Sequence, residues 1–249
     1  KWPRRVNKQT VRKTGRSSPK SSATGSDNHM AAIFLDLDGT LIDPKEGITG
    51  SIQYALQEMG LEDIPTKDDL TWCIGPPLWD SFRVLLGERA DVTEAVNLYR
   101  ERYTDTGMFE ADVYDDIGEM LEGLRETGLP LFIATSKPHS YANIICEHFG
   151  LSHFVDGLYG SELDGTNSDK TDLLAHVLAE TGVDPNRSVM IGDRKHDIIG
   201  AQNNDIRSLG VLWGYAEEGE LHMAEADALA GDPTEVAEIV IEMLGLDED

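Results

Sequence analysis

The chain has 249 residues, of which 40% are hydrophobic and 27% carry a charge. A chain of this length and composition can bury the core of one or two globular domains. It has no apolar run long enough to cross a bilayer, which excludes a membrane-embedded protein. Its two cysteines, Cys73 and Cys146, lie far apart in the sequence. We expect two reduced thiols in a cytoplasmic protein, not a disulfide or a metal site.

The net charge of −25 divides into two segments of opposite sign. Residues 1–30 contain eight Lys and Arg and one acid, Asp27, so residues 31–249 contain 13 bases and 45 acids, a net charge of −32. A body this acidic repels nucleic acid and anionic membranes, and we expect neither as a partner. A high density of carboxylates is also typical of salt-adapted proteins, and salt adaptation of this chain is a hypothesis.

The basic segment 1–30 shows no helical or strand period and has few apolar residues, so we expect it to be disordered. Three origins are open: sequence derived from cloning ahead of a native Met30, a natural basic arm, or a transit-like peptide. We favour the first, because the chain begins with Lys and His29-Met30 resembles a cloning junction. The segment is left out of the fold prediction.

From residue 31 onward, apolar strands alternate with amphipathic helices. Continuous apolar runs predict strands at 31–36, 131–135, 157–160, 189–192, 208–212 and 226–229. Helical periodicity, with start and stop signals such as Pro138 and Gly182, predicts helices at 115–127, 138–149, 168–181, 195–203 and 233–244. This alternation indicates an α/β fold with a doubly wound parallel sheet, which binds ligands beyond the carboxyl ends of its strands.

One segment, residues 44–114, interrupts this alternation. It contains helical patterns only, at 48–59, 78–86 and 92–104. We therefore predict an α/β core domain formed by residues 31–43 and 115–249, with a helical domain inserted between its first two strands.

Two aspartates, Asp36 and Asp38, directly follow the first predicted strand in the run Asp-Leu-Asp-Gly-Thr-Leu-Ile-Asp. Residues two apart in an extended segment point the same way, so both carboxylates can face one site. Paired carboxylates suit Mg²⁺, and Gly39 allows the backbone to turn sharply. By themselves these residues are equally consistent with a plain strand-ending turn.

Polar residues also follow the other predicted strands. Thr135 and Ser136 end one strand, where a hydroxyl and helix-initiating amides suit a phosphate. Asp193 and Asp197 follow another strand, and Lys170 begins the helix that precedes that strand. Taken singly, Lys170 fits a solvated lysine at a helix start, and Asp193 fits a helix-capping residue. Taken together, these groups place acids, a hydroxyl and a cation at one edge of the sheet.

These motifs, in this order, resemble those of the haloacid dehalogenase superfamily. Asp36 to Thr40 matches the first motif of the family, Thr135 the second and Lys170 the third, and Asp193 with Asp197 matches the fourth. The resemblance covers Ala31 to the C-terminus, is greatest to phosphoglycolate phosphatase-like members, and identifies segment 44–114 with the family's C1-type helical cap. It implies an HAD-like Rossmannoid core and a Mg²⁺-dependent phosphatase that acts through an aspartyl-phosphate.

The resemblance implies a role for each site residue. Asp36 is the expected nucleophile, and Asp38 the general acid and then base, for which we predict a raised pKa. Mg²⁺ is expected on Asp36, the backbone carbonyl of Asp38 and Asp193, with Asp197 orienting ligands or water from the outer shell. The phosphoryl oxygens are expected to contact Thr135, the amide of Ser136, and Lys170.

Specificity is expected to come from the segment 44–114, where a Gly-Pro-Pro loop lies between Trp72 and Trp79. This loop either closes over the substrate or simply starts a helix whose tryptophans pack in the interior. We expect Arg83 to be exposed, and His139, His148 and His153 to be helix and loop residues.

Several functions compete with a phosphatase. A β-phosphoglucomutase-like phosphomutase shares the paired aspartates, and a non-catalytic binding protein is the hypothesis from a different class. A dehalogenase lacks the equivalent of Asp38. The ester is left open between a phosphoglycolate-like compound, a 5′-nucleotide and a sugar phosphate, and the oligomeric state between monomer and homodimer.

Overall fold

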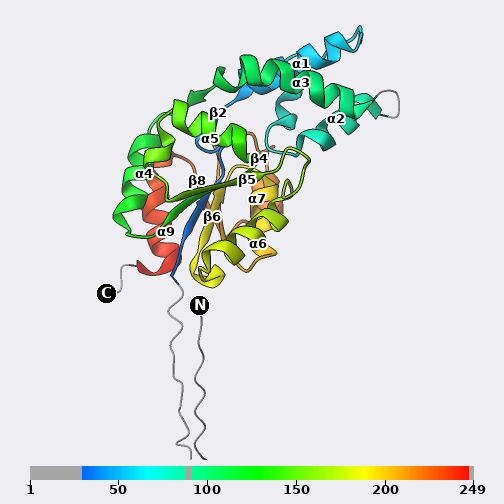
Figure 1. The fold of residues 1–249 in the computed structure, drawn as a ribbon. Helices are drawn as coiled ribbons and strands as arrows, with labels where there is room; N and C mark the ends of the chain where they lie inside the picture. The colour runs from blue at the N-terminus through cyan, green and yellow to red at the C-terminus, as the bar shows by residue number, and fades with distance from the viewer. Residues whose placement is uncertain (1–29, 88–90, 247–249) are drawn as a thin grey trace, which may run out of the picture.

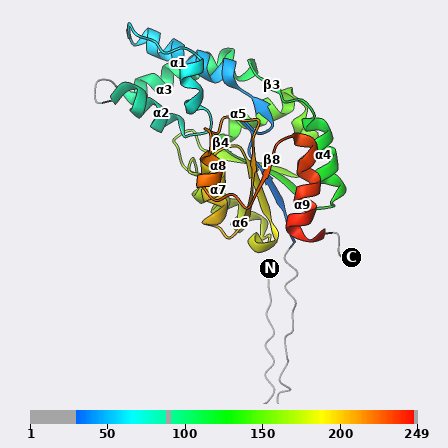
Figure 2. The same cartoon turned by 180° about the vertical axis from the view of Figure 1, so that it is seen from behind.

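A computed structural model describes residues 30–87 and 91–246 (Figure 1). The predicted basic tail, except Met30, lies outside these residues. A sheet forms the centre of the molecule, helices cover both of its faces, and a further group of helices lies beyond one end of its strands (Figures 1 and 2). Within the described ranges, no helix combines the length and the apolarity needed to cross a bilayer.

The main sheet has six strands in the order β5-β4-β1-β6-β7-β8. All of its pairings are parallel. The strands are β1 (Ile33–Leu35), β4 (Leu131–Pro138), β5 (Gly157–Ser161), β6 (Val189–Gly192), β7 (Arg207–Val211) and β8 (Ala228–Ala230). The chain adds β4 and β5 on one side of β1 and then returns to add β6 on the other, so the direction of winding reverses next to β1. The predicted doubly wound α/β fold is confirmed.

The helices of the core cover both faces of this sheet (Figures 1 and 2). In β1, Ile33 and Leu35 belong to a buried cluster with Leu121, whereas Phe34 belongs to a second cluster with Leu174. Both faces of the strand are therefore apolar, which explains its continuous apolar run. The helices are α4 (Ile117–Glu126), α5 (His139–His148), α6 (Lys170–Thr181), α7 (Lys195–Gln202), the short α8 (Glu220–Met223) and α9 (Val236–Leu244).

The segment 44–114 is mainly helical, and we call it the cap segment. It contains α1 (Lys45–Glu58), α2 (Leu78–Leu86) and α3 (Val92–Asp105), with short 3₁₀ turns at Asp68–Cys73 and Gly107–Phe109. The prediction of helices alone was wrong at its end, because β3 (Asp112–Val113) pairs antiparallel with β2 (Ile42–Asp43). These strands of two residues are too short to produce a sequence pattern. Their pairing places the entry and exit of the segment side by side.

Candidate active site

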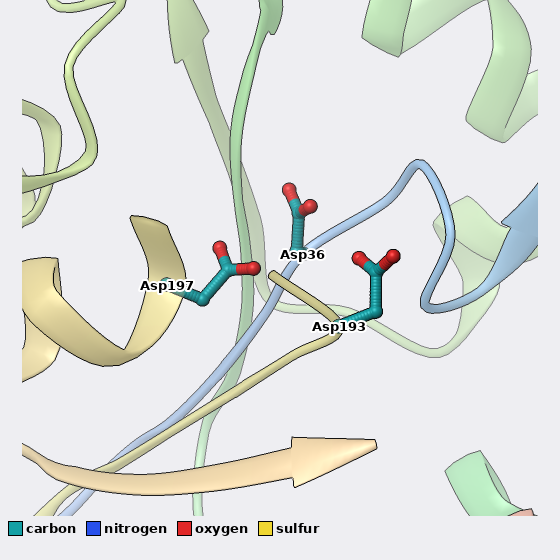
Figure 3. Close-up of side chains that lie close together, drawn as sticks. All are labelled: Asp36, Asp193 and Asp197. Atoms are coloured by element: carbon teal, nitrogen blue, oxygen red, sulfur yellow. The ribbon is translucent and has the colours of Figure 1, made fainter. Parts of the chain in front are cut away.

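Three carboxylates from two neighbouring strand ends form a compact cluster. Asp36 directly follows β1, Asp193 follows β6, and Asp197 lies in the first turn of α7. One carboxylate oxygen of each lies within 4.8 Å of the others, and all three residues are buried. Figure 3 shows Asp197 reaching from its helix toward the other two. The adjacency of β1 and β6 brings together residues that are more than 150 positions apart.

The turn after β1 is shaped to fit around Asp193. Gly39 has φ +81°, and a Cβ at this position would lie 2.2 Å from Oδ2 of Asp193, so a larger residue would displace the carboxylate. Thr40 donates its hydroxyl to Oδ1 of Asp193 at 3.3 Å, and the amide of Tyr215 donates to Oδ2 at 2.7 Å. Burial, and then the neighbouring carboxylates, raise the pKa of Asp193 well above its usual value.

Lys170 connects two members of the cluster to the sheet. Its Nζ lies 2.9 Å from Oδ1 of Asp36 and 2.7 Å from Oδ1 of Asp197, and it donates to the carbonyl of Ala134 at 2.8 Å. Burial alone would lower the pKa of Lys170, but the charges of Asp197 and Asp36 outweigh it and raise the pKa. Lys170 is therefore a fixed positive charge beside the expected nucleophile.

This cluster fits a divalent cation. Among the described residues, the cluster has three buried carboxylates and one ammonium group, that of Lys170, which pairs with Asp36 and Asp197, so the ionised cluster has an excess of two negative charges. Carboxylate oxygens are the ligands that Mg²⁺ prefers. Asp197, expected in the outer shell, contributes an oxygen to the same cluster as Asp36 and Asp193.

The side chain of Asp38 is directed elsewhere. Its Oδ2 pairs with Nζ of Lys137 at 2.8 Å, and its Oδ1 is buried without a hydrogen-bond partner among the described residues. Burial raises the pKa of Asp38, although the ammonium of Lys137 opposes the shift. The direction is the one predicted for a group that must hold a proton when substrate binds.

Thr135 and Ser136 lie near the end of β4, where its pairing with β5 is irregular. The register shifts between Thr135 and Pro138, so Ser136 and Lys137 have no paired residue in β5, and pairing resumes at Pro138 and Ser161. Oγ1 of Thr135 accepts from the amide of Lys137 at 3.3 Å, and the carbonyl of Ser136 accepts from the hydroxyl of Ser161 at 2.8 Å. Both Thr135 and Ser136 line the cavity that also contains Asp36.

That cavity lies between the core and the cap segment, and its wall includes aromatic rings from both. The aromatic residues lining it are Trp79, Tyr99, Tyr103 and Tyr141. The Gly-Pro-Pro loop, Gly75 to Pro77, lines the cavity as well, which favours the functional interpretation of that loop. Both flanking tryptophans pack against the hydrophobic core, but of the two only Trp79 also lines the cavity.

Sequence reasoning missed four residues of this region. Lys137 and Arg194 directly follow predicted site residues, so their positions in the motifs were an available signal. Tyr103 and Arg100 come from α3, where they fit an ordinary amphipathic helix and gave no signal. Arg83 is exposed as predicted and pairs with Asp80 on the same helix.

Residues 33–211 match the sequence model of a family described as haloacid dehalogenase-like hydrolase. A 5′-nucleotidase from Pseudomonas aeruginosa is 45% identical over 190 residues, which cover 76% of this chain and 86% of that protein. The tyrosine-protein kinase PtkA of Mycobacterium tuberculosis is 40% identical over 184 residues, which cover 74% of this chain and 62%, less than two thirds, of the kinase. The crystal structure of a predicted phosphatase from Clostridium acetobutylicum superposes with a TM-score of 0.80 at 36% identity, over 86% of this chain and 99% of that chain.

Proposed function

This chain belongs to the haloacid dehalogenase-like hydrolases, and on that premise we propose that it hydrolyses phosphate monoesters, with 5′-nucleotides as its substrates. The predicted enzyme class, a phosphatase, is confirmed by the family and the relatives.

For the chemistry, we propose that a carboxylate oxygen of Asp36 attacks the phosphorus atom. The bond from phosphorus to the leaving oxygen breaks as an aspartyl-phosphate forms, and Asp38 gives its proton to the departing alkoxide. Asp38 then takes a proton from water, whose oxygen attacks phosphorus and releases Asp36. Lys170, 2.9 Å from Asp36, offsets the negative charge that gathers there.

The buried acids support Mg²⁺ as the cofactor. Asp36, Asp193 and Asp197 would hold the ion, together with the backbone carbonyl of Asp38 that the family resemblance implies. When bound, Mg²⁺ neutralises negative charge on the phosphoryl group. Thr135 and the amide of Ser136 are the proposed contacts for the remaining phosphoryl oxygens.

The observation that carries the choice of substrate is the aromatic wall of the cavity above the two aspartates. The guanidinium of Arg100 lies 6.0 Å from the centre of the Trp79 ring, and Tyr99 stacks on Tyr103 with ring centres 5.1 Å apart. Flat aromatic and guanidinium groups stack well on a nucleobase. A glycolate leaving group is too small to use these walls. The similarity to a protein named 5′-nucleotidase supports the same choice.

The test is phosphate release from matched esters, with Mg²⁺ and with EDTA. Adenosine 5′-monophosphate and ribose 5-phosphate share the phosphate and the sugar and differ in the base; phosphoglycolate and p-nitrophenyl phosphate complete the panel. We expect metal-dependent release that is fastest from the nucleotide and absent in Asp36→Asn. Equal rates with ribose 5-phosphate would contradict the nucleotide proposal. Release from no ester would contradict hydrolysis itself and turn attention to mutase activity on β-glucose 1-phosphate.

A further inference from the structure

A buried lysine joins the expected proton donor to the cap segment. Nζ of Lys137 lies 2.8 Å from Oδ2 of Asp38 and donates a hydrogen bond to the hydroxyl of Tyr103 at 2.5 Å. Lys137 comes from the end of β4 in the core, whereas Tyr103 comes from α3 in the cap segment. All three residues are buried, with whole-residue exposures of 8% for Lys137, 7% for Asp38 and 3% for Tyr103.

The contact leaves Asp38 with one restrained oxygen and one open oxygen. Oδ2 is paired with Lys137, whereas Oδ1 is buried without a hydrogen-bond partner among the described residues. Asp38 also lines the cavity that would hold the ester. An unpaired buried oxygen is costly unless a ligand satisfies it. The leaving-group oxygen of a substrate is a suitable partner for Oδ1.

Aromatic packing within the cavity fixes the position of Tyr103. Its ring stacks on Tyr99 at 5.1 Å and lies 6.0 Å from the ring of Tyr141, which belongs to α5 of the core. Nζ of Lys137 also lies 5.0 Å from the centre of the Tyr103 ring, within the range of a cation–π contact. The hydroxyl therefore meets Lys137 at a defined place when α3 is docked against the core.

We propose that Lys137 and Tyr103 are positioning residues, which turn Oδ1 of Asp38 toward the leaving-group oxygen and do so fully only when the cap segment is docked. This inference rests on the proposed hydrolysis and adds to it a link between the cap segment and proton transfer. The cap segment then contributes to catalysis as well as to substrate choice. Without the hydroxyl of Tyr103, the ammonium of Lys137 loses a hydrogen-bond acceptor and is held less firmly. The carboxyl group of Asp38, which pairs with Lys137, then samples other orientations.

The inference makes a prediction that depends on the leaving group. An alkoxide needs a proton as it departs, whereas p-nitrophenolate departs readily without one. Misplacing the proton donor should therefore slow the attack of Asp36 on alkyl esters and spare the activated aryl ester. The quantity to compare is kcat/KM, because it reports the steps up to release of the alcohol and omits the later attack by water.

The experiment measures kcat/KM of Tyr103→Phe for adenosine 5′-monophosphate and for p-nitrophenyl phosphate. The substitution removes one hydroxyl and keeps the ring. General acid catalysis contributes on the order of 10²–10⁴-fold, so we expect a loss of about 10-fold for the nucleotide and of less than about 2-fold for the aryl ester. Lys137→Met should show the same inequality with a larger loss. Circular dichroism and thermal unfolding check that both variants fold.

Tyr54→Phe is the matched control. It removes a tyrosine hydroxyl from α1, on the outside of the cap segment, where the hydroxyl contacts Glu101 at 3.4 Å. We expect wild-type kcat/KM for both esters. An equal loss for both esters in folded Tyr103→Phe, or no loss for either, would overturn the positioning role alone. Failure of the wild type and of Tyr54→Phe to release phosphate would overturn the proposed hydrolysis and this inference with it.

Discussion

Arg194 donates a hydrogen bond from its Nη1 to the backbone carbonyl of Ile74, 2.5 Å away and 120 positions earlier in the chain. The residue that follows the metal-site candidate Asp193 thus contacts the loop of the cap segment that lines the cavity. Glu220 balances the charge of this arginine, with Oε1 at 3.0 Å from Nε. Both members of the pair are buried. The guanidinium of Arg194 therefore connects the fourth motif to the loop of the cap segment and to α8.

Substituting Glu220 should destabilise the protein strongly. Glu220→Gln leaves the buried guanidinium of Arg194 without a paired carboxylate among the described residues, and breaking a buried pair in this way costs about 3–5 kcal/mol. We expect a loss of about 3 kcal/mol in the free energy of unfolding, measured by urea denaturation. The KM for substrate should also rise, because the loop at Ile74 is no longer held.

The control is an ion pair on the surface. Arg83 and Asp80 pair across one turn of α2, and both side chains are more than half exposed. Arg83→Ala should change the free energy of unfolding by less than about 1 kcal/mol. A similar loss in both variants would mean that the burial of the Arg194 pair has no energetic consequence.

Gly39→Ala should remove metal binding. Its Cβ would lie 2.2 Å from Oδ2 of Asp193, so the carboxylate must move. Gly60 is the matched control, because it has a similar φ of +77° and a Cβ there meets no described atom within 4 Å. Both variants should lose about 1–2 kcal/mol through the left-handed backbone. Only Gly39→Ala should also abolish the rise in melting temperature that Mg²⁺ produces; an equal rise in both variants would contradict the proposed site.

The features that the sequence predicted are those with a local signal. Continuous apolar runs located the strands, and the change from apolar to polar residues located their ends, so Asp36 and Asp193 could be placed at one edge of the sheet. Boundaries differed slightly, since the strand predicted at 31–36 is Ile33–Leu35 in the structure. Where the hydrogen-bonded pairing of a strand ends depends on the length and position of its neighbouring strands. The sequence of one segment does not contain that information.

The features that the sequence missed depend on contacts between distant segments. The bond from Lys137 to Tyr103 joins β4 to the cap segment, and the bond from Arg194, the N-cap of α7, to Ile74 joins that helix start to a loop. A lysine after Thr135-Ser136 is equally consistent with an exposed helix start, and its burial depends on how α3 docks. No periodicity in either segment contains that information.

Replacing Trp79 should raise KM for nucleotides more than it raises KM for sugar phosphates. Stacking of a base on an aromatic side chain contributes about 1–3 kcal/mol, so Trp79→Leu should raise KM for adenosine 5′-monophosphate by about 10-fold. KM for ribose 5-phosphate should change by less than about 2-fold, because that ester has no base to stack. Steady-state kinetics on both esters measures the difference. Equal changes in KM would show that Trp79 only shapes the cavity.

The two cysteines should make the protein less stable at high pH. Burial raises the pKa of Cys73 and of Cys146 to about 12, from an ordinary value of 9.0. Between these values the unfolded chain has released the thiol protons and the folded chain has kept them, so unfolding releases protons and the free energy of unfolding falls as pH rises. The fall approaches about 1.4 kcal/mol per pH unit for each thiol between the two pKa values, and it vanishes only well below pH 9, where the unfolded thiols also keep their protons.

Urea denaturation of the wild type and of the double variant Cys73→Ala, Cys146→Ala, from pH 8 to pH 11, isolates this contribution. Other groups also titrate in this range, but they are common to both proteins, so the difference in slope belongs to the thiols. We expect a shallower decline in the double variant above pH 9. Both cysteines are free and buried, so iodoacetamide should also alkylate the native protein slowly and the unfolded protein rapidly. Parallel pH curves, or rapid alkylation of the native protein, would show that these thiols ionise as readily in the folded chain as in the unfolded one.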